Sequence, residues 1–365
     1  MSNSRSLFLK PLTIGFSVLL FSSVVLAQHY QQTNLVSNVP GRAAVTDPNL
    51  VNSWGLVHGP GTPWWVADNG TGLSTLYDGA GHILPLVVRI PTASGTGTGN
   101  PTGIVFNGNP HEFLITPGNR AFFIFVTEDG TISAWNPNVN PSSAVLKVNN
   151  TKSGAVYKGA TIGEIGEKHY LFVANFHSAQ VEVYDTYFHR VGISEEVFDD
   201  DQLPPGFAPF NIQGIGPNIY VTYAKQDAAK QDDVHGPGLG YVDVFSPRGN
   251  LLQRLQHGLW FNGPWGVTLA PADFGEFSHA LLIGNFGGHT IAAFNPVTGR
   301  FIGNMRNPNG STLNIDGLWG LNFGNGNKAG PANILFFTAG PDDETNGLFG
   351  TLTPIAAELN AGDEQ

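Results

Sequence analysis

Polar side chains recur at two equivalent places in six similar segments of the chain. The first place lies just before an apolar run, and its residues are Asn52, Asn100, Lys158, Asn211, Asn262 and Asp316. Amide and carboxylate oxygens are ligands that Ca²⁺ prefers. A calcium site is therefore predicted if the fold gathers five of them around one axis: Asn52, Asn100, Asn211, Asn262 and Asp316. The alternative is that each side chain hydrogen-bonds to its own turn, as Asn and Asp before a strand commonly do.

The second place is the loop after the following apolar run. The candidate ligand-binding residues in these loops are Asn175, Lys225, Asn285, Asp342, Asp343 and Glu344. Two histidines of the same loops, His177 and His289, could act as a base near a polarised carbonyl. Acidic loops are also ordinary solvated surface, and no fixed spacing defines a ligand set here. Both interpretations therefore stay open.

Several well-defined chemistries are excluded. The chain has no Gly-x-Ser-x-Gly elbow, no His-Glu-x-x-His, no Rossmann glycine pattern and no EF-hand loop. The glycine-rich run 95–99 lacks the Lys-Ser/Thr pair of a phosphate-binding loop. Cysteine is absent, which excludes thiol catalysis, thiolate metal sites and iron–sulfur clusters.

Short strands must position these residues, because the apolar runs repeat at a period of about fifty residues. The dipeptides that open them are Trp54-Gly55, Thr102-Gly103, Lys158-Gly159, Trp265-Gly266 and Trp319-Gly320, with Pro209-Phe210-Asn211 in the remaining slot. Such a period, built from β-branched and aromatic runs separated by Gly, Pro, Asn and Asp, is typical of propeller blades. The chain is predicted to be all-β, a six-bladed β-propeller in one domain.

The inner strands are predicted at 54–57, 103–106, 160–165, 212–215, 266–269 and 320–323. The sixth blade lacks a fourth strand, and the segment 33–39 precedes blade one without a blade of its own. We expect this N-terminal strand to complete the last blade, which removes an open sheet edge. The fourth strand of blade three is predicted at 190–198. Each Trp-Gly is interpreted as packing, with Trp in the wedge between neighbouring blades and Gly at the tight entry to the strand.

Successive strands of a blade run antiparallel, so both groups of polar residues are predicted to lie on one face, at the mouth of the central channel. The loop of blade four, Lys225 to Leu239, is long and carries mixed charge. We expect it to rise over the mouth as a flap, either as a lid or as a tolerated insertion.

The ends of the chain carry signals of a different kind. Arg5 and Lys10 precede an apolar run that ends at a small-residue site, Val25-Leu26-Ala27. This pattern predicts a signal peptide at 1–27, a propeller domain at 28–356, a tail at 357–365, and a secreted or periplasmic protein. No second apolar run of membrane length follows, so no membrane span is expected in the mature chain, which is predicted to be monomeric. The formal net charge is −11, which argues against nucleic acid and anionic membranes as partners.

Several longer motifs resemble a family of secreted bacterial propeller proteins. They are Gly240-Tyr-Val-Asp-Val-Phe245, Gly249-Asn-Leu-Leu252, Pro264-Trp-Gly266, Gly284-Asn-Phe-Gly287, Asp316-Gly-Leu-Trp-Gly320 and Phe337-Thr-Ala-Gly340. This resemblance covers nearly all of the mature chain, supports six blades and implies no established activity. A more distant resemblance is to NHL-repeat propellers and calcium-dependent lactonases, which hold a metal at the channel. Asp316-Gly317 and Asn262-Gly263 lie at comparable places, but a matching inner-strand Glu is missing.

The favoured hypothesis is a non-catalytic binding scaffold of the bacterial envelope whose partner is an unknown small molecule or envelope protein. The alternative is a calcium-dependent hydrolase or lyase acting on a small ester, lactone or saccharide. In that case Asp316, Asn262, Asn100 and Asn52 would hold Ca²⁺, and His177 or His289 would move the proton. Redox use of an unseen cofactor such as a quinone is a third possibility. A mutant-sensitive turnover would separate the enzyme hypotheses from the scaffold.

Overall fold

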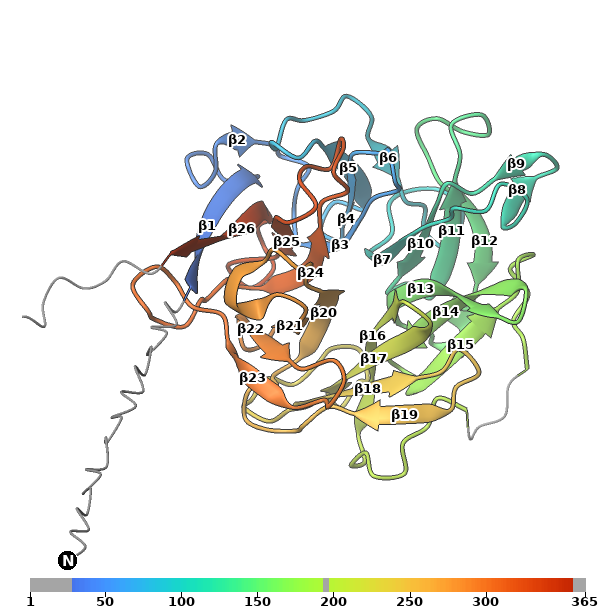
Figure 1. Cartoon of the computed structure of the whole chain (residues 1–365). Helices are drawn as coiled ribbons and strands as arrows, with labels where there is room; N and C mark the ends of the chain where they lie inside the picture. Colours follow the sequence, from blue (N-terminus) through green and yellow to red (C-terminus); the bar gives the residue numbers. More distant parts are fainter. Residues whose placement is uncertain (1–27, 193–196, 357–365) are drawn as a thin grey trace, which may run out of the picture.

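Six β-sheets stand in a ring around one axis in the computed structural model, which describes residues 28–192 and 197–356 (Figure 1). Within these residues the only helical elements are two single 3₁₀ turns, η1 (Thr151–Ser153) and η2 (Gly275–Phe277). Alternating short apolar runs and turn residues leave no stretch for an amphipathic helix. The predicted all-β, six-bladed propeller is confirmed.

Each blade begins at the axis and continues outward through antiparallel strands. Blade one contains β3 (Ser53–Val57), β4 (Trp64–Asp68), β5 (Leu73–Tyr77) and β6 (Val88–Arg89). Blade two contains β7 (Pro101–Phe106), β10 (Phe123–Thr127), β11 (Thr131–Trp135) and β12 (Val145–Asn149), with a separate hairpin of β8 (Leu114–Thr116) and β9 (Asn119–Arg120). Blade three contains β13 (Tyr157–Ile165), β14 (Lys168–Asn175) and β15 (Gln180–Tyr184).

The second half of the ring follows the same plan. Blade four contains β16 (Phe207–Ile215), β17 (Asn218–Lys225), β18 (Gly240–Phe245) and β19 (Leu251–Arg254). Blade five contains β20 (Pro264–Leu269), β21 (Leu281–Asn285), β22 (Thr290–Phe294) and β23 (Phe301–Asn304). Blade six contains β24 (Leu318–Phe323), β25 (Leu335–Ala339) and β26 (Leu348–Ala356).

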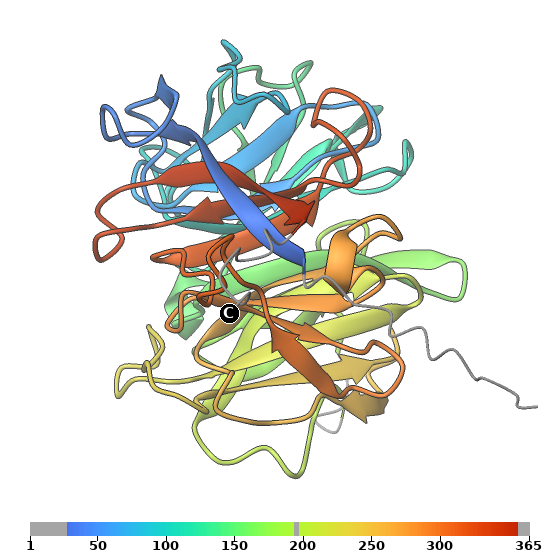
Figure 2. The same ribbon diagram turned by 60° about the vertical axis from the view of Figure 1, so that its left-hand side comes forward.

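The N-terminal strand closes the ring, as predicted. β1 (Gln28–Ser37) pairs antiparallel with β26 from Ser37↔Leu348 to Gln28↔Ala356, with one register shift, and β2 (Val45–Thr46) pairs parallel with β1 (Figure 2). The buried Tyr30 donates its hydroxyl to the carbonyl of Phe274 at 3.0 Å, which ties the closing strand to blade five. Joining the two ends of the chain in one sheet covers the edge that blade six would otherwise expose.

Blade three departs from the prediction. The predicted fourth strand at 190–198 is reduced to an isolated bridge between Tyr184 and Arg190, and part of that range, 193–196, lies outside the described residues. The chain leaves the sheet after Val191, whose amide donates to Val183 at 2.8 Å. It then joins blade four, where the amide of Phe198 donates to Gly249 at 3.0 Å.

The centre of the ring is filled by aromatic side chains, which we call the aromatic plug. Its members come from five blades: Trp54, Phe176, Phe210, Trp265, Phe286 and Trp319. Trp54 stacks on Trp319 with ring centroids 3.4 Å apart and meets the edge of Trp265, a residue of blade five, at 5.9 Å. The prediction that each Trp fills a wedge between neighbouring blades is therefore wrong. The indoles point inward and pack on one another at the axis, where they bury large apolar areas.

The glycine after each inner-strand anchor allows neighbouring blades to approach. A β-carbon on Gly320 would lie 2.7 Å from the carbonyl oxygen of Trp54, and one on Gly55 would lie 2.5 Å from that of Thr102. Blade four places Asn211 at this position, and its amide donates to the carbonyl of Trp265 at 2.7 Å. The inner strands are thus held together by close backbone contact, and in blade four by a hydrogen bond.

The predicted signal peptide at 1–27 and tail at 357–365 fall outside the described residues, so both stay predictions. Over the part of the chain that the structure describes, no helix has the length and apolar character needed to cross a membrane.

Candidate functional site

A cavity of about 360 Å³ lies at one end of the aromatic plug, and we call it the mouth. The residues that line it are Asn52, Trp54, Asn69, Asn100, Glu128, Asp129, Gln231, Asp232 and Glu344. They come from the starts of inner strands and from the loops between second and third strands of blades one, two, four and six. Both kinds of position, the strand starts and the loops between second and third strands, therefore contribute residues to one cavity.

Lys158 provides a buried positive charge beside this cavity. Its side chain is 1 % exposed, and Nζ contacts the Glu128 carboxylate and lies 3.3 Å from Asp232 Oδ1. The same ammonium lies over the ring of Trp54, 5.0 Å from its centroid. Burial alone lowers the pKa of Lys158, but the carboxylates of Glu128 and Asp232 outweigh burial and raise that pKa above its usual value. Lys158 is therefore a permanent ammonium.

A chain of side-chain hydrogen bonds runs around the mouth from blade two to blade six. Asn69 donates to Glu128 Oε2 at 2.8 Å. Asn52 donates to Asn69 Oδ1 at 3.3 Å and to Glu344 Oε1 at 3.0 Å, and its own carbonyl accepts from the Trp319 indole at 3.1 Å. Connected polar side chains of this kind fix one another's orientation, so the wall of the mouth is pre-formed.

Glu344 is the carboxyl of the mouth with the strongest tendency to hold a proton. Burial, together with the nearby charges of Glu128 and Asp232, raises the pKa of Glu344 to about 7, against the opposing effects of the Asn52 hydrogen bond and the Lys158 ammonium. Its loop is strained, because Asp342, Asp343 and Glu344 have φ values of 58°, 52° and 61°. Arg42 holds this loop through Asp342 at 2.7 Å.

The blade-four loop reaches over the mouth, as predicted for the flap. Gln231 and Asp232 line the cavity, and Asp232 pairs with Lys158. The base of the flap is fixed on both sides. The side chain of Gln226 donates to the carbonyl of Phe176 in blade three, and the amide of Gly236 donates to Asn262 Oδ1 in blade five at 2.7 Å.

Two of the five predicted metal ligands line the mouth, Asn52 and Asn100. The other three have different partners. Asn211 donates to the carbonyl of Trp265 in blade five. Asn262 accepts from the amide of Gly236 in the flap and donates to the carbonyl of Gly287 at 2.8 Å. Asp316 is 55 % exposed and accepts from the amide of Asp342 at 2.9 Å. The described residues include no group of three or more His, Asp or Glu side chains that could hold a metal ion, and the calcium site stays a prediction.

Among the other predicted site residues, only Glu344 lines the mouth. Asn175 donates to Glu182 at 2.9 Å, and Asn285 accepts from the amide of Asn262 at 3.1 Å, so both support local backbone and side chains. Lys225 turns away and donates to the carbonyl of Pro205 at 2.9 Å. Asp342 binds Arg42, and Asp343 is exposed beside it.

The two histidines lie outside the residues that line the mouth. His289 accepts the amide hydrogen of Gly317 on Nδ1 at 3.0 Å, and Asp316 Oδ1 is 3.6 Å from the same nitrogen. An accepting Nδ1 implies that the neutral ring carries its proton on Nε2. His177 is half-buried in the loop after β14.

The sequence analysis missed the centre of the site, Lys158 with Glu128 and Asp232, although it placed Lys158 and the blade-four loop that carries Asp232 at the mouth. A usable signal was present. Lys158 is the one cation in a slot that Asn or Asp fills in the other blades. A buried cation in such a slot requires carboxylate partners, and the loops of blades two and four supply them.

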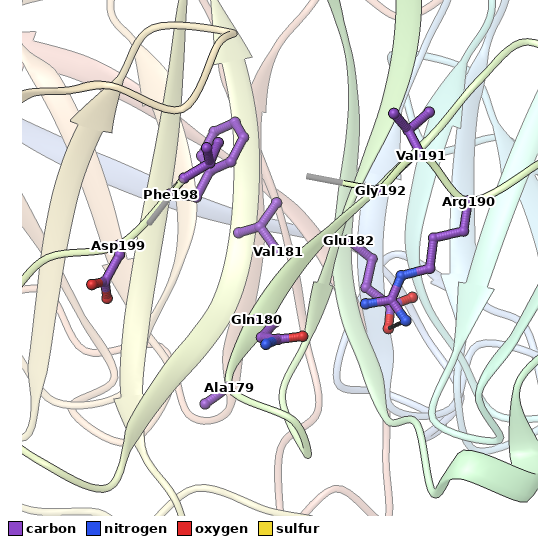
Figure 3. A pocket seen from close by; sticks show the side chains of 10 residues that line it. Ala179, Gln180, Val181, Glu182, Arg190, Val191, Gly192, Phe198 and Asp199 are labelled. Atoms are coloured by element: carbon purple, nitrogen blue, oxygen red, sulfur yellow. Dashed lines mark ion pairs between the residues drawn. The ribbon is translucent and has the colours of Figure 1, made fainter. Parts of the chain in front are cut away.

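A second cavity of about 360 Å³ lies at the edge of blade three (Figure 3). It lies between β15 and the described residues 190–192 and 197–199, and its lining includes Val181, Glu182, Arg190 and Phe198. The buried Glu182 accepts from the hydroxyls of Tyr157 and Tyr184 at 2.8 and 2.6 Å, and Arg190 Nη1 is 3.4 Å from its other oxygen (Figure 3). These partners satisfy the carboxylate of Glu182.

No protein-family model matches the chain. In solved structures the similarity is at the level of the fold. Streptogramin B lyase has a TM-score of 0.52 and 10 % identity, covering 92 % of this chain and all of that one. A Bacteroides thetaiotaomicron protein of unknown function has a TM-score of 0.54 and 11 % identity, covering 90 % of this chain and 76 % of that one. A glucose dehydrogenase has a TM-score of 0.52 and 12 % identity, covering 88 % and 98 %.

Two sequence relatives come from Acanthamoeba polyphaga mimivirus. The uncharacterized protein R648 is 32 % identical over 326 residues, which cover 87 % of this chain and 78 % of R648. The uncharacterized protein L690 is 33 % identical over 326 residues, which cover 87 % of this chain and 84 % of L690. These relatives are viral and give no support to the bacterial assignment of the resemblance. The chain belongs to the propeller family that includes the mimivirus proteins R648 and L690.

Proposed function

We propose that this protein is a binding propeller that holds a small polar molecule in the mouth. The observation that carries the proposal is the mouth itself, a cavity of about 360 Å³ lined by amide and carboxylate groups from four blades. Ligand cavities in proteins start at about 300 Å³, so the occupant is small.

The aromatic plug supports this proposal because it forms a floor. Trp54 belongs both to the plug and to the lining of the mouth. On the far side of the plug the channel retains a cavity of only about 30 Å³. A ligand in the mouth would therefore enter and leave from one face.

The composition of the mouth favours binding over nucleophilic catalysis. Among the described residues that line it there is no Ser, Thr, His or Lys side chain, and the neighbouring Lys158 is held as an ammonium. Pre-formed walls lower the cost of ordering the site when a ligand binds. Export of the protein, which the predicted signal peptide would direct, is also part of the proposal.

The test is a ligand-observed NMR screen of small polar compounds against the full chain and two variants. Asn100 is exposed, lines the mouth and makes only a long side-chain contact of 3.5 Å, so Asn100→Trp fills the cavity without disturbing the core. Asn138→Trp adds the same ring to an exposed turn between β11 and β12, on the opposite face. We expect compounds that bind the wild type and Asn138→Trp but not Asn100→Trp. Compounds that bind all three proteins equally would refute a site in the mouth.

A second candidate function is acid–base catalysis by Glu344, as a lyase or hydrolase. One observation favours it: the pKa of Glu344 is raised to about 7, where a carboxyl can both give and take a proton near neutral pH. Turnover of a panel of esters, lactones and glycosides, measured with wild type and Glu344→Gln, tests it. An activity that Glu344→Gln abolishes would make the protein an enzyme, and an activity that survives this change would come from elsewhere.

A further inference from the structure

The described residues that line the mouth include four carboxyl groups and no cationic side chain. The acidic lining residues are Glu128, Asp129, Asp232 and Glu344, and the single buried cation beside them is Lys158. Lys158 neutralises Glu128 and contacts Asp232, which leaves Asp129 and Glu344 without a cationic partner in the described part of the chain. A ligand that enters this cavity therefore meets uncompensated negative charge.

The hydrogen bonds already made in the mouth leave the same imbalance. Asp129 uses Oδ2 to accept the amide of Asn100 at 2.9 Å, and Glu344 uses Oε1 to accept from Asn52 at 3.0 Å. Within the described residues the second oxygen of each carboxyl has no protein donor. Asn69 donates to Glu128, and Asn52 donates to Asn69 and to Glu344, so these two amides already use donors on acceptors within the mouth.

Trp54 supplies an aromatic surface at the mouth. Its ring lines the cavity and is 3 % exposed. The Lys158 ammonium lies over the same ring, 5.0 Å from its centroid, which shows that a cation is stable at the face of this indole.

We propose that the ligand of the mouth is a small organic cation that carries a primary ammonium group. The ammonium binds to the carboxylates of Asp129 and Glu344, which line the same cavity. This inference rests on the proposed function, since it names the ligand class of the same site. The charged and titratable groups around Glu344 include Lys158, Glu128, Asp232 and His235.

Calorimetric titration with a matched pair of probes tests the ligand class. The probes are 5-amino-1-pentanol and 1,5-pentanediol, which have nearly the same shape and differ in one ammonium group. At pH 8 and low salt, where both Glu344 and the amine are charged, we expect the amino alcohol to bind at least about fivefold more tightly, since one exposed ion pair contributes about 1 kcal/mol. Equal binding, tighter binding of the diol, or no binding of the amino alcohol would overturn the inference.

Single-charge variants locate the contact. Glu344→Gln keeps an acceptor for Asn52, and Asp129→Asn keeps one for the amide of Asn100, so each removes a charge with little structural change. We expect each variant to bind the amino alcohol at least about fivefold more weakly than the wild type does. Asp343→Asn is the matched control, because it removes an exposed charge from the same loop without lining the mouth and keeps a residue suited to positive φ. An equal loss in Asp343→Asn would show a general field effect and refute the assigned contacts.

The NMR screen separates this inference from the proposed function. If the compounds that Asn100→Trp excludes are neutral, the mouth is a binding site and the ammonium assignment is wrong. If no compound is excluded by Asn100→Trp, the proposed function itself fails. Calcium chloride, titrated alone, provides the third arm. Calcium binding that abolishes amino alcohol binding would mean that the two acidic groups serve a metal ion and would overturn the organic cation.

Discussion

Replacing Lys158 with methionine should destabilise the protein through charge alone. Methionine keeps most of the volume of the side chain, but it removes the ammonium that faces Glu128 and lies over the rings of Trp54 and Phe176. Breaking a buried ion pair by removing one partner costs about 3–5 kcal/mol, because the other charge stays buried. Glu128 is 17 % exposed and keeps the donor from Asn69, which places the expected loss near the lower end, at about 3 kcal/mol.

The second partner contributes little to this loss. Asp232 is 69 % exposed and 3.3 Å from the ammonium, so water replaces the lysine there and the pair contributes less than about 1 kcal/mol. Urea unfolding followed by tryptophan fluorescence reports on the aromatic plug directly and gives the free energy of unfolding. The double variant Lys158→Met/Glu128→Gln should recover most of the lost stability, since it leaves no uncompensated charge at this position. A variant within about 1 kcal/mol of wild type at pH 8, or one that Glu128→Gln fails to rescue, would refute the assignment of Lys158 as a structural cation.

Three further predictions concern the frame around the mouth. Gly320→Ala should lower the free energy of unfolding in urea by about 2 kcal/mol or more, because the added methyl would lie 2.7 Å from the backbone of the neighbouring blade. Gly61→Ala is the control: an added methyl there has nothing within 4 Å, so stability should change by less than about 0.5 kcal/mol. Burial, reinforced by Asp200, raises the pKa of Asp243 to about 8, so this group stabilises the fold below about pH 4 and loses that contribution as the pH rises through 8. Thermal unfolding across this range should show a decline in stability of at most about 6 kcal/mol that Asp243→Asn removes, and a parallel decline in the variant would contradict this assignment. Tyr30→Phe removes the buried hydroxyl that connects the closing strand to blade five, and it should lower the free energy of unfolding by about 1–2 kcal/mol. Hydrogen exchange of the β1 amides should be faster in this variant. Unchanged exchange would show that strand pairing with β26 is sufficient to hold β1 in place.

The architecture was predictable because it depends on local patterns. A strand needs only a short apolar or β-branched run and turn residues at its ends, and both repeat visibly along the chain. The closing role of the N-terminal strand followed from counting strands, since blade six lacked one. The prediction failed at blade three, where the apolar residues Val191 and Phe198 looked like a strand. The amide of Val191 donates to blade three and that of Phe198 to blade four, and such backbone pairing cannot be read from apolar character alone.

The site was only partly predictable, because a polar residue at a strand start has two uses that look the same in sequence. Asn52 contributes to the wall of the mouth, whereas Asn262 satisfies backbone groups of the flap and of blade five. Only the partner distinguishes them, and partners depend on how far each loop reaches across the ring. The Trp-Gly repeats were misassigned for the same reason. The spacing placed each indole on an inner strand, but its direction toward the axis is a property of the closed ring.

Lys158 also bears on the choice between a metal ion and an organic cation in the mouth. A calcium ion that used Glu128 would have to displace an ammonium that is already desolvated and placed over Trp54. That exchange leaves a buried lysine without its carboxylate, which opposes binding by the same few kcal/mol that stabilise the pair. Asp129 and Glu344, which lie in the same cavity and have no such competitor, remain available. The charge arrangement therefore directs a cationic ligand to these two carboxylates, with Lys158 acting as the fixed counter-charge that keeps the other acidic groups in place.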